Sequence, residues 1–180
     1  IYTEKQAELL QSKFDQKSYP KVIVRSAMRY GKPSVDDGLT QLRAEGCDQI
    51  LVAPLYPQYN SSTTGSIYDA VFHSLKTVRN LPGIRLIKHF HDHNGYIQAL
   101  SHKVKDYSAT HGKPDKLILS YHGVPKFSLT KGDPYHCECY KTSRLLAEQL
   151  DFKPEDVITT FQSRFGRAEW LKPYTIDVMK

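Results

Sequence analysis

Short apolar runs alternate with stretches of helical periodicity along this chain, and no other feature constrains the fold as strongly. Between two such runs, Val35, Leu39 and Leu42 fall at i, i+4 and i+7, which is one face of a helix. Repeated alternation of strand and helix predicts a parallel sheet with helices on both faces. The sequence therefore predicts an α/β fold, with strands at 21–28, 49–55, 84–88, 116–121 and 156–161.

Capping signals mark where some of the helical patterns begin. Ser34 can cap a helix in which Asp37 stands three residues later, a variant of the capping box. Gly46 ends that helical pattern. The sequence predicts helices over 3–17, 35–45, 67–78, 94–107 and 136–150.

A polar stretch at His93–Asn94 follows one of the predicted strands, and Asn94 can cap the helix after it. We expect the domain boundary there. The expected N-terminal domain covers 1–93 and the expected C-terminal domain covers 94–180.

Polar loops follow several of the predicted strands. In open α/β sheets, ligands bind beyond the carboxyl ends of the strands. We therefore expect the functional groups on this rim, in the segments Arg29–Tyr30, Tyr56–Ser66, Tyr121–Lys126 and Gln162–Arg167.

His122 directly follows the apolar strand LILSY and precedes Gly123. A histidine at that position faces the ligand side of a parallel sheet. Neutral imidazole can accept a proton near pH 7 or bind a transition metal, and glycine lets a ligand or backbone approach closely. The alternative is a histidine that only ends a strand and bonds to a loop carbonyl.

The segment HFHDH places three histidines at alternate positions, His89, His91 and His93. In an extended chain these side chains point to one face, and imidazole suits Zn, Cu, Fe and Ni. A specific metal site also needs converging ligands and supporting groups. Because the segment ends a predicted strand, we favour a solvated connector over a metal site.

The chain has three cysteines, Cys47, Cys137 and Cys139. They do not form the pattern of a secreted disulfide framework, which indicates a reducing, cytoplasmic setting. The C-x-C pair lacks the usual zinc spacing, and an iron–sulfur cluster needs about four ligands. We therefore expect ordinary thiols and no permanently bound cofactor.

Lys and Arg number 25 against 19 Asp and Glu, a formal charge of +6. Such an excess favours an acidic partner, which leaves nucleic acid, a membrane surface or a small polycarboxylate. The basic residues are scattered, so we predict no nucleic-acid binding. The sequence has no apolar run near the roughly 20 residues of a membrane span, and peripheral membrane association stays open.

Several longer stretches resemble one enzyme family. The chain is similar to the ferrochelatases, which insert ferrous iron into protoporphyrin to make protohaem, and its second half looks most like the proteobacterial branch. The stretches run through nearly the whole chain in family order. They are MRYGKPS (28–34), PLYPQYNSSTTGS (54–66), LSYHGVP (119–125), GDPYHCECYKTSRLLAEQL (132–150) and FQSRFGRAEWLKPYT (161–175).

The resemblance implies two Rossmann-like domains of the class II chelatase type, with the porphyrin held between them. It implies a lyase that catalyses the terminal step of haem biosynthesis, with protoporphyrin IX and Fe²⁺ as substrates. It also implies that His122 is the active-site histidine and contacts the metal. Its role as proton acceptor or as iron donor stays open. The porphyrin-binding residues that the resemblance implies are Arg29, Tyr30, Ser61 and Ser163.

Two departures from the family pattern accompany the resemblance. The family begins with a strand and an N-L-G-x-P loop, and it carries an acidic helix after the PYT motif. This sequence has neither, so we expect an internal segment of a longer protein with an incomplete active site. Two alternatives stay open: a sirohydrochlorin-type chelatase, whose substrate carries more carboxylates, and a non-catalytic porphyrin-binding protein.

Overall fold

The computed structural model describes residues 2–17 and 21–180. The chain divides into two compact units. The first contains the described residues up to Pro54 together with Ser62–Ile87, and the second contains Leu55–Ser61 and Lys88–Lys180. These units are defined by their internal contacts, and the domain boundary expected at His93–Asn94 stays a prediction.

A pair of parallel strands lies at the centre of the first unit, β1 (Gln49–Val52) and β2 (Gly83–Leu86). Gln49 is the register partner of Gly83, and Val52 that of Leu86. The helices of this unit are α1 (Tyr2–Asp15), α2 (Val35–Ala44) and α3 (Ser66–Leu75), and a π-helical turn, η1 (Ser61–Gly65), leads into α3.

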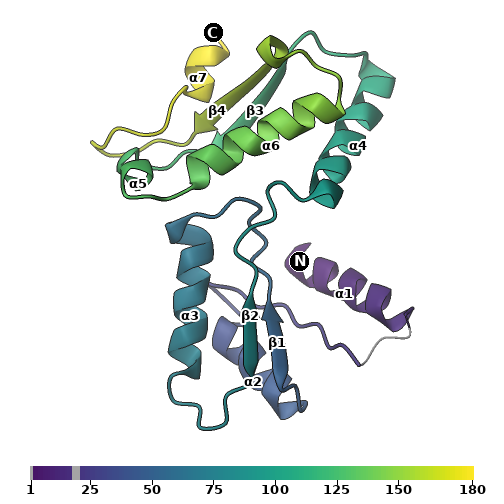
Figure 1. Ribbon diagram of the computed structural model, residues 1–180, viewed down its shortest axis with the longest axis vertical. Helices are drawn as coiled ribbons and strands as arrows, with labels where there is room; N and C mark the ends of the chain where they lie inside the picture. The colour runs from purple at the N-terminus through teal and green to yellow at the C-terminus, as the bar shows by residue number, and fades with distance from the viewer. Residues whose placement is uncertain (1, 18–20) are drawn as a thin grey trace. The chain divides into compact units, whose positions relative to one another are not determined.

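The core of the first unit joins α2, α3 and β1, which are labelled in Figure 1. Leu39 of α2, Ile50 of β1, and Val71 and Leu75 of α3 are buried against one another. Burying apolar side chains of this size contributes roughly 1.5–3 kcal/mol each. The apolar face predicted for α2 therefore does pack in this core, with Val35 and Leu42 partly buried against it.

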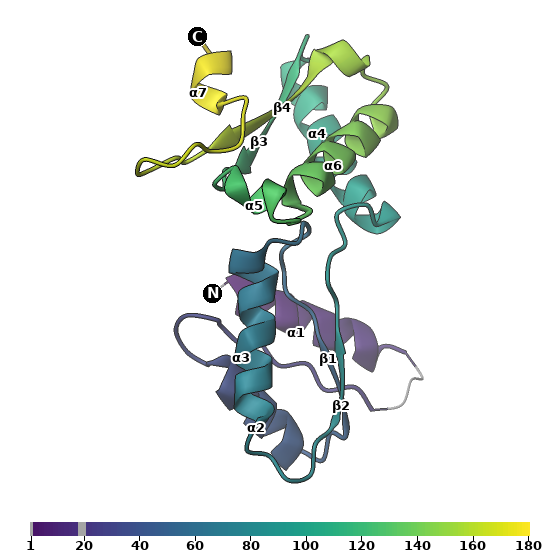
Figure 2. The ribbon, with the colours of Figure 1, turned by 60° about the vertical axis from the view of Figure 1, so that its left-hand side comes forward.

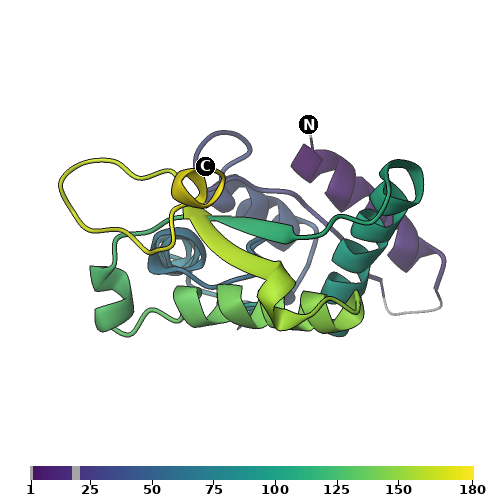
Figure 3. The same cartoon turned by 90° about the horizontal axis from the view of Figure 1, so that it is seen from above.

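The second unit also has a central parallel pair, β3 (Leu117–His122) and β4 (Val157–Gln162), in register from Leu117↔Val157 to His122↔Gln162. Figures 2 and 3 show α6 and α7 on opposite sides of this pair. Cys139 of α6 packs with Phe161 of β4 and Leu171 in its core. The helical elements here are α4 (Asn94–His111), α5 (Phe127–Thr130), α6 (Tyr135–Gln149), η2 (Pro154–Asp156) and α7 (Thr175–Val178).

Parallel strand pairs flanked by helices confirm the predicted α/β class. One predicted strand is wrong, because 21–27 carry no strand in the structure. The backbone there bonds to a side chain instead of to a neighbouring strand. The Val24 N–H donates to Gln11 Oε1 at 2.7 Å, and Gln11 Nε2 donates to Val22 O at 2.9 Å. A strand needs a ladder partner as well as β-branched residues.

The capping box predicted at the start of α2 is confirmed. The Asp37 N–H donates to Ser34 Oγ at 3.1 Å, and the Ser34 N–H donates to Asp37 Oδ2 at 2.8 Å. The bond from the Ser34 backbone and the nearby Lys32 ammonium lower the pKa of Asp37 to about 2. The carboxylate is therefore ionised near neutral pH and accepts the bonds from the Ser34 N–H and from Lys32 Nζ.

We expect Ser34→Ala to lower the free energy of unfolding by about 1 kcal/mol, because the Asp37 N–H loses its acceptor. Urea unfolding followed by circular dichroism measures the change. Thr40→Ala, in the exposed middle of the same helix, is the control and should leave stability within about 0.5 kcal/mol. Equal stability of the two variants would contradict the cap's contribution.

The start of α4 differs from its prediction by one residue. His93, not Asn94, is the N-cap, with an extended backbone and Nδ1 accepting a bond from the Gly95 N–H at 3.2 Å. The Nδ1 atom that accepts this bond must be unprotonated. The side chain of His93 therefore has a local structural role.

Candidate functional site

His122 is the last residue of β3, and its side chain is exposed at the carboxyl end of the strand pair. Its carbonyl oxygen accepts a bond from Tyr135 Oη at 2.9 Å. Burial raises the pKa of the Tyr135 phenol, which keeps the hydroxyl protonated as a donor. The backbone of His122 is thus fixed from both the β4 ladder and α6, while the imidazole faces solvent.

Gly123, after His122, allows the two strands to approach each other closely. Its N–H donates to Gln162 O at 2.7 Å. A Cβ atom at Gly123 would lie 2.8 Å from that same oxygen and 3.3 Å from the Trp170 ring. The sequence predicted that a group would lie close to this glycine, and the groups that do so are the Gln162 carbonyl and the Trp170 indole ring.

The loop after β4 returns to the segment that follows His122, and Figure 3 shows it reaching out beyond the strand ends. Lys126 N–H donates to Glu169 O at 2.8 Å, and Leu171 N–H donates to Val124 O at 3.0 Å. Ser163 begins this loop with φ +64, in the left-handed region that non-glycine residues seldom adopt. His122 and the exposed Ser163 thus lie at the same end of the β3–β4 pair.

Ser61 is also exposed, and its backbone is held in the second unit by one carboxylate. The Ser61 N–H donates to Asp133 Oδ2 at 2.8 Å, and Asn60 Nδ2 donates to the same oxygen at 3.1 Å. Asp133 Oδ1 accepts from the Tyr135 N–H at 3.0 Å, at the start of α6. Asp133 therefore joins the Ser61 turn to the helix whose tyrosine anchors His122, a role that sequence reasoning missed.

Arg29 and Tyr30 lie together in the first unit. Arg29 Nε donates to Ser66 O at 3.0 Å and to Ser66 Oγ at 2.7 Å, at the start of α3. Its guanidinium carbon lies 4.7 Å from the centre of the Tyr30 ring, a cation–π contact. Both side chains are exposed, so a fixed cation and an aromatic ring face solvent together.

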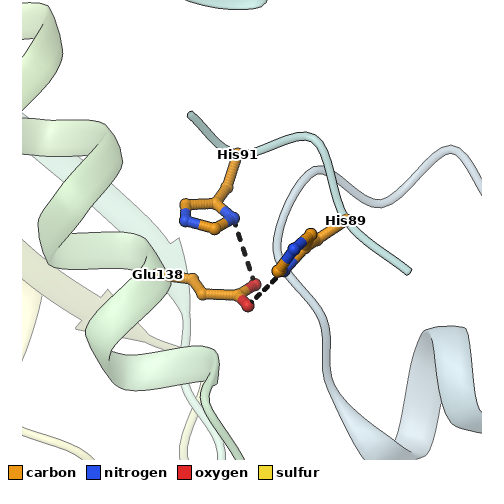
Figure 4. A group of neighbouring side chains, drawn as sticks. All are labelled: His89, His91 and Glu138. Atoms are coloured by element: carbon orange, nitrogen blue, oxygen red, sulfur yellow. Dashed lines mark hydrogen bonds and ion pairs between the residues drawn. The ribbon is translucent and has the colours of Figure 1, made fainter. Parts of the chain in front are cut away.

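The predicted solvated connector is wrong for His91, which is buried, whereas His89 and His93 of the HFHDH segment are exposed. The exposed fraction of His91 is only 4%, and that of Glu138 on α6 is 6%. Figure 4 shows both imidazoles directed at the Glu138 carboxylate. His89 Nδ1 lies 2.5 Å from Oε1, and His91 Nδ1 lies 3.4 Å from Oε2. Burial lowers the pKa of His91 despite the nearby carboxylates, so the His91–Glu138 contact involves a neutral ring.

The cysteines differ from one another in their surroundings. Cys139 is fully buried in the core of the second unit, and burial raises the pKa of its thiol to about 12. Such a thiol is protonated at neutral pH, and the thiol form is neither a good nucleophile nor a metal ligand. Cys137 is exposed, and Cys47 is partly buried in the first unit.

The family model described as ferrochelatase matches residues 1–180. The chain belongs to the ferrochelatase family. It is 56% identical over 175 residues to the ferrochelatase of Aromatoleum aromaticum, covering 97% of this chain and 48% of that protein. It is 53% identical over 180 residues to the ferrochelatase of Janthinobacterium sp. (strain Marseille), covering 100% of this chain and 49% of that protein.

A solved structure resembles the fold. SirB from Bacillus subtilis with Fe³⁺ superposes with a TM-score of 0.70 at 18% identity, covering 98% of this chain and 64% of that chain. At this identity the likeness concerns the fold alone, and it agrees with the predicted chelatase-like α/β class. The chain spans about half the length of the curated ferrochelatases it matches. Among the helices of the described residues, none has the length and apolar character needed to cross a membrane.

Proposed function

We propose that this protein is a ferrochelatase, a lyase that inserts Fe²⁺ into protoporphyrin IX to form protohaem, the terminal step of haem biosynthesis. One observation carries the proposal: ferrochelatases are more than half identical to this chain along nearly all of its length. Fe²⁺ is a substrate here, and the proposal includes no resident cofactor. A cytoplasmic setting, predicted from the cysteines, is part of the same proposal.

The reaction replaces two pyrrole N–H protons with one divalent ion. Fe²⁺ and the free porphyrin give haem and two protons, so the protein must accept protons close to the ring. We propose His122 for this position, because its imidazole is exposed at the carboxyl end of β3 while its backbone is anchored. A neutral imidazole can take a pyrrole proton or pass Fe²⁺ to the ring nitrogens.

Arg29, Tyr30, Ser61 and Ser163 are proposed to bind the porphyrin. The macrocycle is apolar on its faces and carries two propionates on its edge. An exposed guanidinium suits a propionate, since charge-assisted bonds to carboxylates are strong and often bidentate. An exposed aromatic ring such as Tyr30 suits the flat apolar macrocycle, and hydroxyls such as those of Ser61 and Ser163 can donate to its polar groups.

We expect Arg29→Ala to weaken porphyrin binding about tenfold, because a hydrogen bond to a charged group contributes about 1.5–3 kcal/mol. Titration of protoporphyrin fluorescence with the full-length protein, at the length of its relatives, measures the affinity. The KM for porphyrin should rise while kcat changes little. Arg25→Ala removes an exposed arginine that is paired with Glu45 and is the matched control. Equal affinity of the two variants would contradict the assignment of Arg29.

An anaerobic assay with Fe²⁺ and protoporphyrin IX tests the proposed activity itself. Insertion removes free-porphyrin fluorescence in proportion to enzyme and time. A porphyrin-binding protein without catalytic activity would quench the fluorescence once, in proportion to its concentration, and show no Fe²⁺-dependent turnover. That result would indicate that the protein is a porphyrin carrier and not an enzyme.

A further inference from the structure

The cluster formed by His89, His91 and Glu138 lies within the second unit and does not include His122. Glu138 comes from the first turn of α6, and the two histidines come from the segment before α4 (Figure 4). One ligand atom from each residue lies within 4.8 Å of the others. The three side chains therefore converge although they come from separate parts of the chain.

Two of these side chains are buried, and one of the two, His91, has a ring nitrogen without a hydrogen-bond partner among the described residues. A buried carboxylate is costly unless hydrogen bonds or a cation compensate its charge. Glu138 Oε2 accepts a bond from the Tyr59 N–H at 2.6 Å, and Oε1 contacts His89. The Nδ1 atom of His91 is buried and has no hydrogen-bond partner among the described residues. It lies 3.4 Å from Oε2, so its lone pair or proton is directed into the cluster but bonds to nothing there.

Buried hydrogen bonds hold the backbone on both sides of the cluster. Thr142, one turn after Glu138 on α6, donates from Oγ1 to His91 O at 2.9 Å. Gln58 Nε2 in turn donates to Thr142 Oγ1 at 3.0 Å. These bonds attach the segment that carries His91, and the segment that carries Tyr59, to the helix that carries Glu138. Ligands positioned in advance by such surrounding bonds are typical of metal sites.

Two imidazole nitrogens and one carboxylate define the class of ion. Imidazole suits first-row transition metals, whereas Mg²⁺ and Ca²⁺ take oxygen ligands. Bonds of about 2.1 Å in a tetrahedral site place neighbouring ligand atoms about 3.4 Å apart. His91 Nδ1 and Glu138 Oε2 already lie 3.4 Å apart. His89 would have to withdraw about 1 Å from Oε1 to reach that spacing, and its side chain is 39% exposed.

We propose that His89, His91 and Glu138 bind a divalent first-row transition-metal ion such as Zn²⁺, Fe²⁺ or Co²⁺. This inference goes beyond the proposed insertion reaction and assigns a metal site that the reaction does not use. Three protein ligands leave a fourth position for water. The exposed side of His89 is the path by which the ion enters.

Zn²⁺ titration of the metal-free, full-length protein by calorimetry tests the site, in a His122→Ala background that removes the proposed reaction-site imidazole. We expect one site with a Kd of about 1 µM or tighter. His89→Gln and Glu138→Gln should each weaken it at least about tenfold, because each removes one of three ligands. His93→Gln, which changes the third histidine of the segment, is the matched control and should bind Zn²⁺ as the parent does.

Thermal unfolding gives a second readout that is independent of enzyme activity. Zn²⁺ that binds only the folded protein raises Tm, and at the same Zn²⁺ concentration this rise should be as large in His93→Gln as in the parent and clearly smaller in His89→Gln. His89 is exposed enough that its replacement should leave the fold intact, which circular dichroism checks. Zn²⁺ affinity and Tm shifts equal in the parent and His89→Gln, or no binding tighter than about 1 mM in the parent, would overturn the proposal.

Discussion

Insertion of Fe²⁺ into protoporphyrin IX is expected to fall at least about 100-fold in His122→Ala, the low end of what positioned acid–base groups contribute. The imidazole is exposed at the carboxyl end of β3, and its backbone is held by Tyr135 and the β4 ladder. Alanine keeps those backbone bonds and removes only the exposed ring. Porphyrin affinity should therefore stay within about threefold of the parent, a difference under about 1 kcal/mol.

Turnover is measured anaerobically as Fe²⁺-dependent loss of porphyrin fluorescence, and affinity by quenching in the absence of metal. His102→Ala, an exposed histidine on α4, is the matched control and should insert Fe²⁺ at the parental rate. Turnover at the parental rate in His122→Ala would show that this residue does not take part in the reaction. Loss of turnover in both variants would mean that the effect of His122→Ala is not specific to this histidine.

The largest effect on stability is expected from Phe161→Ala. Phe161 is 1% exposed, packs with Cys139 and Leu171, and lies 5.8 Å from the His136 ring between centroids. Removing a buried phenylalanine ring costs about 3–5 kcal/mol, because the lost burial and the remaining cavity both count. Since whole domains are stable by only about 5–15 kcal/mol, this variant should lose a large part of the stability of the protein.

Urea unfolding, with the same protein and the same buffer, measures the difference. Phe127→Ala is the matched control, because that ring is 53% exposed on α5 and its loss should cost less than about 1 kcal/mol. A loss of less than about 1 kcal/mol in Phe161→Ala would contradict the assignment of this ring to the core of the second unit.

Much of the fold follows from local patterns. The capping box at Ser34 and the apolar spacing after it predict α2 because both signals lie within a few residues of each other. The run at 116–121 similarly predicts β3. The run at 21–28 has the same apolar character, yet its backbone bonds to Gln11 instead of a strand. Whether such a run pairs with a strand or with a side chain depends on its neighbours in the folded protein, which the local sequence does not specify.

The candidate sites also differ in how far the sequence predicts them. The position of His122 at a strand end follows from the sequence, because the end of an apolar run is visible locally. The burial of His91 does not, because it depends on Glu138, and the His89–Glu138 contact spans 49 residues of the chain. Glu138 stands between Cys137 and Cys139, so the spacing of the two thiols, and not the carboxylate, is the metal-binding pattern visible in the sequence there. The sequence around Glu138 does not show its burial, which depends on tertiary contacts.

The most direct test of the central claim is anaerobic Fe²⁺ insertion by the full-length protein, measured side by side on protoporphyrin IX and sirohydrochlorin. We predict turnover on protoporphyrin IX that exceeds turnover on sirohydrochlorin at least about tenfold, a difference of about 1.4 kcal/mol in transition-state binding. Equal or faster insertion into sirohydrochlorin, or binding of protoporphyrin IX without any Fe²⁺-dependent turnover, would contradict the ferrochelatase assignment.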